Sequence, residues 1–344
     1  MILERSLVSP PRVKVGDTVA VVSPSFGAVG RWPHRAERGR AYLESLGLKV
    51  MIMPNASGDS GWVSAAAEAR ADDIHDAFLN DAVTAVVCST GGDHSNQLLK
   101  HLDYELIRSH PKVFQGYSDI TVLHWAFMKH AGLKTFYGPA FCLGMAEYPK
   151  VLDYTDYWMK EAWFGGDLLS WQPPVAWTQE FLDFNQQKDL ERARAMTPGT
   201  RWKCLRPGVA DGPLYGGCFE TICWHLKGST EWLDMTDAVF FFETSEQSPK
   251  PDTVDALLAD LENLGVFQKV AAVVMGRPHG YSDADKERVW ELVLNYTSQS
   301  GVPVLADIDC GHTDPMLTFP LGARVHLDAG NLILRTLEPA TAPR

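Results

Sequence analysis

The chain has 344 residues, 45% of them hydrophobic and 22% charged, a composition typical of a folded protein with a sizeable core. Its formal net charge of -12 argues against nucleic acid or an anionic membrane as a partner, because both would repel it, and favours a small molecule. No signal-peptide core or membrane-spanning run is present, so we predict a cytoplasmic protein. The six cysteines lack CxxC spacing, which favours reduced thiols over a zinc site.

The first half of the chain alternates short apolar runs with amphipathic stretches. Apolar, β-branched runs predict buried strands at residues 17–23, 49–53, 82–89 and 113–116. Helical periodicity predicts helices at residues 33–46, 65–80 and 119–130, the second with Ser64 as its N-cap. Because strands and helices alternate, we expect a mostly parallel sheet covered on both faces, in a first α/β domain of residues 1–165.

The pattern is lost between residues 166 and 206, where Trp, Gln, Pro and charged residues dominate. We interpret this segment as a linker or inserted lobe, with a polar helix-like stretch at residues 180–194. Periodicity then returns, and predicts strands at residues 238–242, 270–275 and 302–308 and a helix at residues 253–263. These elements predict a second, smaller α/β domain of residues 207–344.

A serine occupies the junction between a predicted strand and a predicted helix, in the run Gly116-Tyr117-Ser118-Asp119. A sharp turn there exposes the Ser118 hydroxyl and aims the amide N–H of Asp119 at the space beside it, as an oxyanion donor. The GxSxG elbow is absent, and serine or aspartate at such a place commonly only caps the helix. Ser118 is therefore a candidate nucleophile.

A glycine pair, Gly91 and Gly92, follows the predicted strand at residues 82–89. In open α/β sheets ligands bind at the carboxyl ends of the strands, and a glycine backbone can approach a substrate closely. Gly91 or Gly92 is thus a candidate for substrate contact and for the second oxyanion amide. A tight turn that requires positive φ explains the pair equally well.

An acid and a histidine stand at strand ends in the second half. Glu243 follows the apolar run at residues 239–242, and His312 follows residues 304–311. A serine nucleophile needs a base to take its proton and an acceptor to hold that base in one tautomer, and His312 and Glu243 can supply these roles. Alternative bases are His279, the best of them, His94, His225 and His124, and alternative acids are Glu246 and Asp309.

Taken together, these runs resemble the LD-carboxypeptidase and microcin C self-immunity family of serine peptidases. The resemblance spans nearly the whole chain, and its most specific parts are G-Y-S-D-I-T from Gly116 and G-H-T from Gly311. It implies a flavodoxin-like, doubly wound N-terminal domain that carries Ser118 as nucleophile. It further implies a C-terminal domain with Glu243 and His312 as the acid and base, in a homodimer. We expect no metal ion or cofactor, since no HExxH or clustered ligand spacing appears.

The run Ser89-Thr90-Gly91-Gly92 favours the microcin-immunity branch of this family. Members of that branch resemble carboxypeptidases that cut the amide between an amino acid and a nucleotide-like phosphoramidate or sulfamate. A small peptide or aminoacyl-nucleotide is therefore the expected substrate. One alternative is a murein tetrapeptide LD-carboxypeptidase. The alternative of another class is a non-catalytic nucleotide- or peptide-binding protein, because fold alone does not settle function.

Two features bear on which substrate is bound. Where the family often reads Gly-Gly-Asn, this chain has Gly216-Gly217-Cys218 followed by Glu220. If Glu220 faces the cleft, its charge disfavours an acidic substrate side chain. The aromatic residues of the lobe that are candidates for stacking on a nucleobase are Trp177, Phe181, Phe184 and Trp202. Ordinary packing of the lobe is at least as good an interpretation for them.

Overall fold

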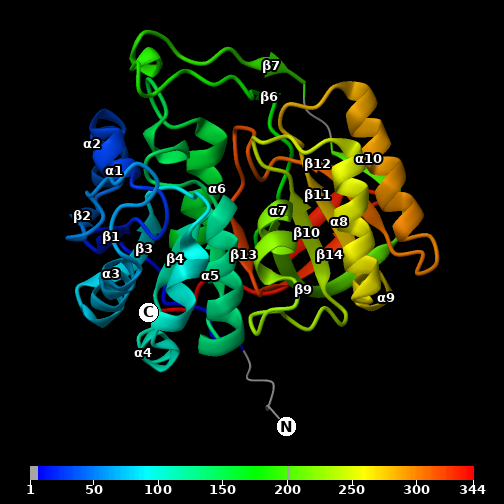
Figure 1. Cartoon of the computed structure of the whole chain (residues 1–344), viewed down its shortest axis with the longest axis horizontal. Helices are drawn as coiled ribbons and strands as arrows, with labels where there is room; N and C mark the ends of the chain where they lie inside the picture. The colour runs from blue at the N-terminus through cyan, green and yellow to red at the C-terminus, as the bar shows by residue number, and fades with distance from the viewer. Residues whose placement is uncertain (1–6, 200–201) are drawn as a thin grey trace.

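Two β-sheets, one built mainly from each half of the chain, organise the fold (Figure 1). The computed structural model describes residues 7–199 and 202–344; residues 1–6 of the predicted first domain and residues 200–201 of the predicted lobe lie outside the described part. Helices cover both sheets, so the predicted α/β class with two domains is confirmed. Within the described ranges, no helix combines the length and the apolar character needed to cross a bilayer.

The first sheet has six strands, in the order β13-β5-β4-β3-β1-β2. Its strands are β1 (Thr18–Val22), β2 (Lys49–Ile52), β3 (Val83–Cys88), β4 (Val113–Gly116), β5 (Thr135–Tyr137) and β13 (Phe319–Leu321). The first five are parallel and run 2-1-3-4-5 across the sheet, the flavodoxin-like order, which confirms that prediction. Strand β13 comes from the second half of the chain and pairs antiparallel with β5. The two halves are therefore joined through this sheet.

The helical segments of the first half include those at the three predicted places, with two differences, and others that were not predicted. They are α1 (Ala28–Arg31), α2 (Pro33–Ser45), α3 (Ala67–Leu79), η1 (Ser95–His101), α4 (Tyr104–Ser109), η2 (Ser118–Ile120), α5 (Thr121–Ala126), η3 (Phe127–Ala131), η4 (Gly144–Ala146) and α6 (Asp153–Phe164). The predicted N-cap Ser64 is wrong: Ala66 occupies the N-cap position of α3 and makes no side-chain cap, and the Ser64 hydroxyl instead donates to the carbonyl of Ser23 at 3.0 Å. The predicted helix at residues 119–130 is divided into a 3₁₀ turn, an α turn and a π turn.

The second sheet has seven strands, in the order β15-β14-β9-β10-β11-β12-β8. They are β8 (Lys203–Arg206), β9 (Val209–Cys218), β10 (Val239–Glu243), β11 (Ala272–Gly276), β12 (Val304–Ile308), β14 (Arg324–Asp328) and β15 (Ile333–Thr336). The helices on it are α7 (Phe219–Thr221), η6 (Ile222–Leu226), α8 (Pro251–Asn263), α9 (Val266–Lys269) and α10 (Asp283–Tyr296). Strands β9 to β12 are parallel, so their carboxyl ends share one edge of the sheet.

The lobe crosses from the first half to the second as an extended strap (Figure 1). Its described residues form the short strands β6 (Ala176–Trp177) and β7 (Thr197–Pro198) and the 3₁₀ turn η5 (Lys188–Leu190), and the end of the predicted lobe is strand β8 of the second sheet. The helix-like stretch predicted at residues 180–194 is therefore wrong. The physical reason is that tertiary contacts override local helix propensity here, because some of its charged side chains bind partners outside the segment. Arg194, for example, pairs with Glu147 and Asp314.

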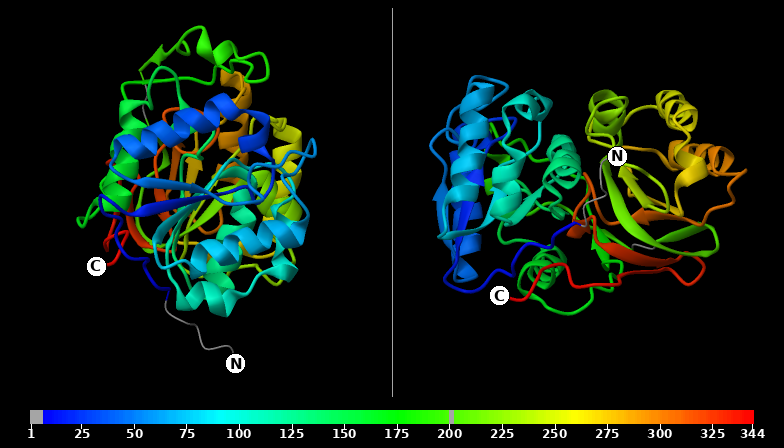
Figure 2. Two further views of the ribbon diagram at one scale, coloured as in Figure 1. Left: turned by 90° about the vertical axis from the view of Figure 1, so that its left-hand side faces the viewer. Right: turned by 90° about the horizontal axis from the view of Figure 1, so that it is seen from below.

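Helix α5 of the first half packs against strand β9 of the second. Trp125 Nε1 donates to the carbonyl of Gly216 at 2.9 Å, and Thr121 Oγ1 accepts from the amide of Cys218 at 3.0 Å. The Gly216-Gly217 pair makes this approach possible: a Cβ on Gly217 would lie 2.4 Å from Thr121 Oγ1. The C-terminal end also returns to the first half, where Pro11 and Ala342 form a β-bridge (Figure 2). The two sheets are thus held at several separate points.

We expect Gly217→Ala to lower the free energy of unfolding by more than about 2 kcal/mol, because the new methyl overlaps Thr121 and the backbone has a φ of 146°. The matched control is Gly301→Ala. That glycine has a φ of 65° but no atom within 4 Å of its added Cβ, so only backbone strain of about 1 kcal/mol is expected. Urea denaturation of both variants measures the difference, and equal losses would contradict the close contact.

Candidate active site

Ser118 lies where β4 ends and the helical segment begins, in a strained backbone conformation. Its φ is 63°, a region that residues other than glycine rarely occupy. The turn is held from both sides, because the Ser118 amide donates to the Tyr137 hydroxyl at 3.1 Å and the Ser118 carbonyl accepts from Thr121 Oγ1 at 2.6 Å. The serine side chain lines a cavity at this edge of the sheet. The sharp turn predicted for this residue is therefore present.

The structure brings Ser118, His312 and Glu243 together. His312 Nε2 lies 3.0 Å from Ser118 Oγ, and His312 Nδ1 lies 2.8 Å from Glu243 Oε2. Glu243 ends β10 and is 1% exposed, while His312 follows β12 and reaches the same point from the neighbouring part of the second sheet. This line of contacts runs from a hydroxyl through an imidazole to a buried carboxylate. It has the geometry of a nucleophile, its base and the acid that orients the base.

Tyr137 completes this arrangement and was not found by sequence reasoning. Its hydroxyl donates to Glu243 Oε1 at 2.5 Å and accepts from the Ser118 amide. The hydrogen bonds therefore form a closed ring from the Ser118 backbone through Tyr137, Glu243 and His312 back to the Ser118 side chain. The one available signal was position: Tyr137 ends β5, the strand beside β4, so it reaches the same sheet edge as Ser118.

We expect Tyr137→Phe to lower kcat by about 10- to 100-fold, because Glu243 loses a donor and the strained Ser118 amide loses its acceptor. The fold should remain, since the ring stays packed against Phe241. Steady-state kinetics and circular dichroism on the same preparation test this. An unchanged kcat would show that the ring of hydrogen bonds does not position the reacting groups.

The sequence matches the two domains of one protein family. Residues 19–138 match the LD-carboxypeptidase N-terminal domain, and residues 211–327 match the LD-carboxypeptidase C-terminal domain. The chain belongs to the LD-carboxypeptidase family. The predicted resemblance is confirmed, and the protein is a carboxypeptidase-like enzyme of this family.

Relatives from both branches of the LD-carboxypeptidase family resemble the chain. The microcin C7 self-immunity protein MccF of Escherichia coli is 30% identical over 336 residues, which cover 96% of each protein. The murein tetrapeptide carboxypeptidase of Pseudomonas aeruginosa is 40% identical over only 79 residues, 23% of this chain and 25% of that protein. The solved structure of MccF in complex with aspartyl sulfamoyl adenosine matches with a TM-score of 0.90 at 29% identity, covering 97% of this chain and 100% of that one.

The predicted oxyanion residues border Ser118. Gly91 lies against the serine: a Cβ on Gly91 would be 3.1 Å from Ser118 Oγ and 3.2 Å from the amide nitrogen of Asp119. Gly92 lines the same cavity and has a φ of 138°, which favours glycine. The Asp119 carboxylate accepts from the amide of Ser95 at 2.9 Å and so fixes the loop that carries the glycine pair. The oxyanion roles of Gly92 and Asp119 stay a prediction that this placement supports.

The cavity at Ser118 has a volume of about 410 Å³. Its walls come from both halves of the chain and from the strap. Its lining includes the predicted residues Gly91, Gly92, Ser118, Phe181, Phe184 and His312 and the alternative base and acid His279 and Glu246. Phe184 is held between the Trp32 ring, 5.2 Å away, and the Arg35 guanidinium, 3.8 Å from its ring centroid. The strap therefore contributes an aromatic wall to the site.

Two residues predicted to bind substrate do not line this cavity. Glu220 is 1% exposed, and its Oε1 accepts from the amide and the hydroxyl of Ser245. Trp202 is 3% exposed and donates from Nε1 to Asp309 Oδ2 at 2.9 Å. Both side chains turn inward because each finds a buried hydrogen-bond partner there. Because Glu220 does not line the cavity, the prediction that its charge disfavours an acidic substrate side chain no longer has a basis.

The alternative bases and acids have other partners. His124 is buried in α5, where burial lowers its pKa to about 4, and His225 contacts Asn96. His94 does not line the cavity, whereas His279 does, with Ser248 Oγ 3.5 Å from its Nδ1.

The alternative acid Asp309 binds Arg277 at 2.5 Å. Burial raises the pKa of the neighbouring Cys310 thiol well above its usual value. The other alternative acid, Glu246, contacts His312, with its Oε2 3.1 Å from His312 Nε2.

The electrostatic surroundings favour the protonated form of His312. Burial is the largest influence and lowers its pKa, but the carboxylates of Glu243 and Glu246 outweigh burial and raise this pKa to about 9. A base must be neutral to accept a proton. Deprotonated His312 is therefore scarce at neutral pH in the free protein and increases as the pH rises. Among the described residues, no group of three metal-binding side chains is present.

We expect kcat/KM to rise about tenfold per pH unit below the His312 pKa and to level off above about pH 9. Glu243→Gln removes the main carboxylate that raises this pKa, so the rise should move to lower pH while the plateau falls. Full pH profiles of both proteins with one amide substrate measure these values. A wild-type profile that is already level at pH 6 would contradict a base in this environment.

The strap is tied to both halves of the chain around the cavity. Arg194 donates to Glu147 of the first half at 2.6 Å and to Asp314 of the second at 2.8 Å. Asp189 is buried and accepts from Arg35 at 2.7 Å and from Arg38. Because these ion pairs are largely removed from water, loss of one partner would leave an unpaired buried charge and cost more than loss of a partner in an exposed pair.

Proposed function

We propose that this protein is a serine carboxypeptidase-like hydrolase that cleaves the amide between an amino acid and a nucleotide-like phosphoramidate or sulfamate, as in the inactivation of microcin C type toxins. The observation that carries the proposal is the line of contacts from Ser118 through His312 to Glu243 at the wall of one cavity. The likeness to MccF in complex with aspartyl sulfamoyl adenosine supports the substrate class.

In the proposed reaction, His312 takes the proton of Ser118 Oγ as that oxygen attacks the carbonyl carbon of the substrate. Glu243 accepts from the other ring nitrogen and stabilises the imidazolium that forms. The amides of Gly92 and Asp119 hold the oxyanion. The carbon–nitrogen bond then breaks, and His312 gives its proton to the leaving nitrogen. Water attacks the acyl-enzyme in the same way, which releases the amino acid and restores Ser118.

The leaving group would lie toward the strap. Phe184 is half-buried, with Phe181 at 5.0 Å as its edge-on neighbour, and both rings line the cavity. A nucleobase can stack on an aromatic ring with little regard to its identity. Phe184 is the predicted stacking residue that this placement supports, while Trp202 lies outside the cavity. A homodimer, which the family resemblance implies, and a cytoplasmic location, which the sequence favours, complete the proposal.

A murein tetrapeptide LD-carboxypeptidase is the second candidate, and the 79-residue match to such an enzyme from Pseudomonas aeruginosa favours it. In that case the leaving group is an amino acid, which gains nothing from an aromatic wall. The lining by Phe181 and Phe184 therefore favours the nucleotide leaving group. A non-catalytic nucleotide- or peptide-binding protein on the same fold would not need a hydroxyl within 3.0 Å of a histidine that an acid orients.

A fluorophosphonate probe should label the wild-type protein but not Ser118→Ala, and Ser118→Ala should lower kcat/KM by roughly four orders of magnitude or more. Both proteins are then compared on aminoacyl-sulfamoyl adenosines and on a murein tetrapeptide by mass spectrometry. Cleavage of the adenosine compounds alone supports the proposal. Cleavage of the tetrapeptide alone would replace it with the second candidate, and activity that survives in Ser118→Ala would refute the mechanism.

A further inference from the structure

Glu246 is a carboxylate beside the reacting groups that the proposed mechanism does not use. Its Oε2 lies 3.1 Å from His312 Nε2, the same nitrogen that contacts Ser118 Oγ at 3.0 Å. The Glu246 side chain is 66% exposed and lines the cavity. A charged oxygen and the nucleophilic oxygen are therefore near neighbours, and both face the space that the substrate acyl group must occupy.

The other carboxylates of the cavity already have cationic partners. Glu147 and Asp314 share Arg194, and Glu180 binds Arg192 at 2.6 Å. Within the part of the chain that the structure describes, His312 is the one cationic group within ion-pair distance of Glu246. Glu246 is thus the carboxylate of this cavity whose charge is available to a ligand.

The contact with His312 cannot persist through the reaction. When His312 accepts the serine proton it must begin neutral, with its hydrogen on Nδ1 toward Glu243 and a lone pair on Nε2. A carboxylate oxygen close to that lone pair is repelled rather than bound. Glu246 is therefore available to a different cation at the moment when the base is ready to act.

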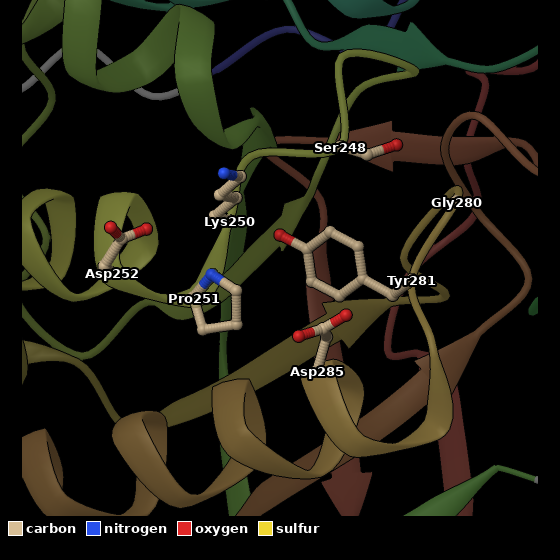
Figure 3. Close-up of a pocket in the computed structure, with 7 residues that line it drawn as sticks. All are labelled: Ser248, Lys250, Pro251, Asp252, Gly280, Tyr281 and Asp285. Carbon is tan, nitrogen blue, oxygen red and sulfur yellow. The ribbon is translucent and has the colours of Figure 1, made fainter.

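The loop that carries Glu246 is anchored on both sides of this residue. Ser245 binds the buried Glu220, and the Tyr281 hydroxyl donates to the carbonyl of Pro249. Figure 3 shows the Tyr281 ring in a second hollow between the starts of α8 and α10, with its hydroxyl toward the chain between Ser248 and Lys250. The carboxylate is consequently presented from a fixed backbone, which favours a specific contact over a diffuse one.

We infer that Glu246 binds the free α-ammonium group of the substrate's acyl residue, and so selects aminoacyl amides over amides whose α-nitrogen is acylated. The α-nitrogen is two bonds from the carbonyl carbon, which must approach Ser118 Oγ to about 3 Å. A cation this close to the reacting carbon can reach Glu246, whereas a basic group at the end of a side chain lies farther away. An acylated nitrogen is neutral and leaves Glu246 without a partner.

This inference rests on the proposed function and specifies its substrate further. The experiment compares alanyl sulfamoyl adenosine with its N-acetyl counterpart, on wild-type protein and on Glu246→Gln. Wild type should prefer the free amine by about 10- to 100-fold in kcat/KM, the usual worth of one charge-assisted hydrogen bond. In Glu246→Gln this preference should largely disappear, through a higher KM for the free amine, while the N-acetyl compound is cleaved as before or faster.

Two further variants sharpen the comparison. Glu246→Lys should invert the preference, because its cation repels the α-ammonium. Glu287→Gln removes an equal charge from the exposed face of α10, away from the cavity, and should leave the preference as in wild type. A loss of preference in Glu287→Gln as well would point to net charge and would overturn the assignment to Glu246.

The possible failures are distinguishable. If the wild-type protein cleaves both compounds equally well, the inference is wrong while the proposed function stands. If it cleaves neither, the proposed function has failed and the inference with it. A preference for the free amine that persists unchanged in Glu246→Gln would show that another group binds the ammonium.

Discussion

The interaction on which the site depends is the pair of hydrogen bonds made by the Glu243 carboxylate, one to Tyr137 and one to His312. Tyr137 ends β5 of the first sheet, Glu243 itself ends β10 of the second, and His312 lies in the loop after β12, so one buried acid joins the edges of both sheets. A carboxylate that is 1% exposed is tolerated only where its oxygens are satisfied, and these two partners satisfy one oxygen each. The distance between Ser118 and its base is therefore set by how the two sheets are held together.

That separation is fixed by contacts away from the chemistry. Helix α5 binds β9 through Trp125 and Thr121, and β13 adds a strand of the second half to the first sheet. Thr121 also donates to the Ser118 carbonyl, so one hydroxyl both contacts the second domain and supports the strained turn. The strain at Ser118 is maintained because its neighbours on both sides are already fixed by packing.

Sequence reasoning found what depends on order along the chain. Parallel strands β1 to β4 followed from apolar runs separated by helices, whereas β5 was not predicted. Ser118, Glu243 and His312 were singled out because each follows a predicted strand. Sequence reasoning could not predict the direction in which a side chain points beyond the end of a strand or helix. Glu220 and Trp202 were expected near substrate, but buried partners from distant segments, Ser245 and Asp309, turn them inward. Tyr137 was missed because a tyrosine at a strand end is an ordinary β residue until its hydroxyl partners are known.

The strap shows, for a whole segment, that sequence reasoning cannot anticipate contacts with distant parts of the chain. Its charged residues suggested a polar helix, yet Asp189 binds Arg35 and Arg38, and Arg194 binds carboxylates from both halves of the chain. Local propensity contributes a few tenths of a kcal/mol per residue, whereas partly buried, charge-assisted hydrogen bonds contribute about 1.5 to 3 kcal/mol each. The tertiary contacts therefore determine the path of the strap. Because that path places Phe184 on the cavity wall, the ion pairs that prevent a helix also shape the surface offered to the leaving group.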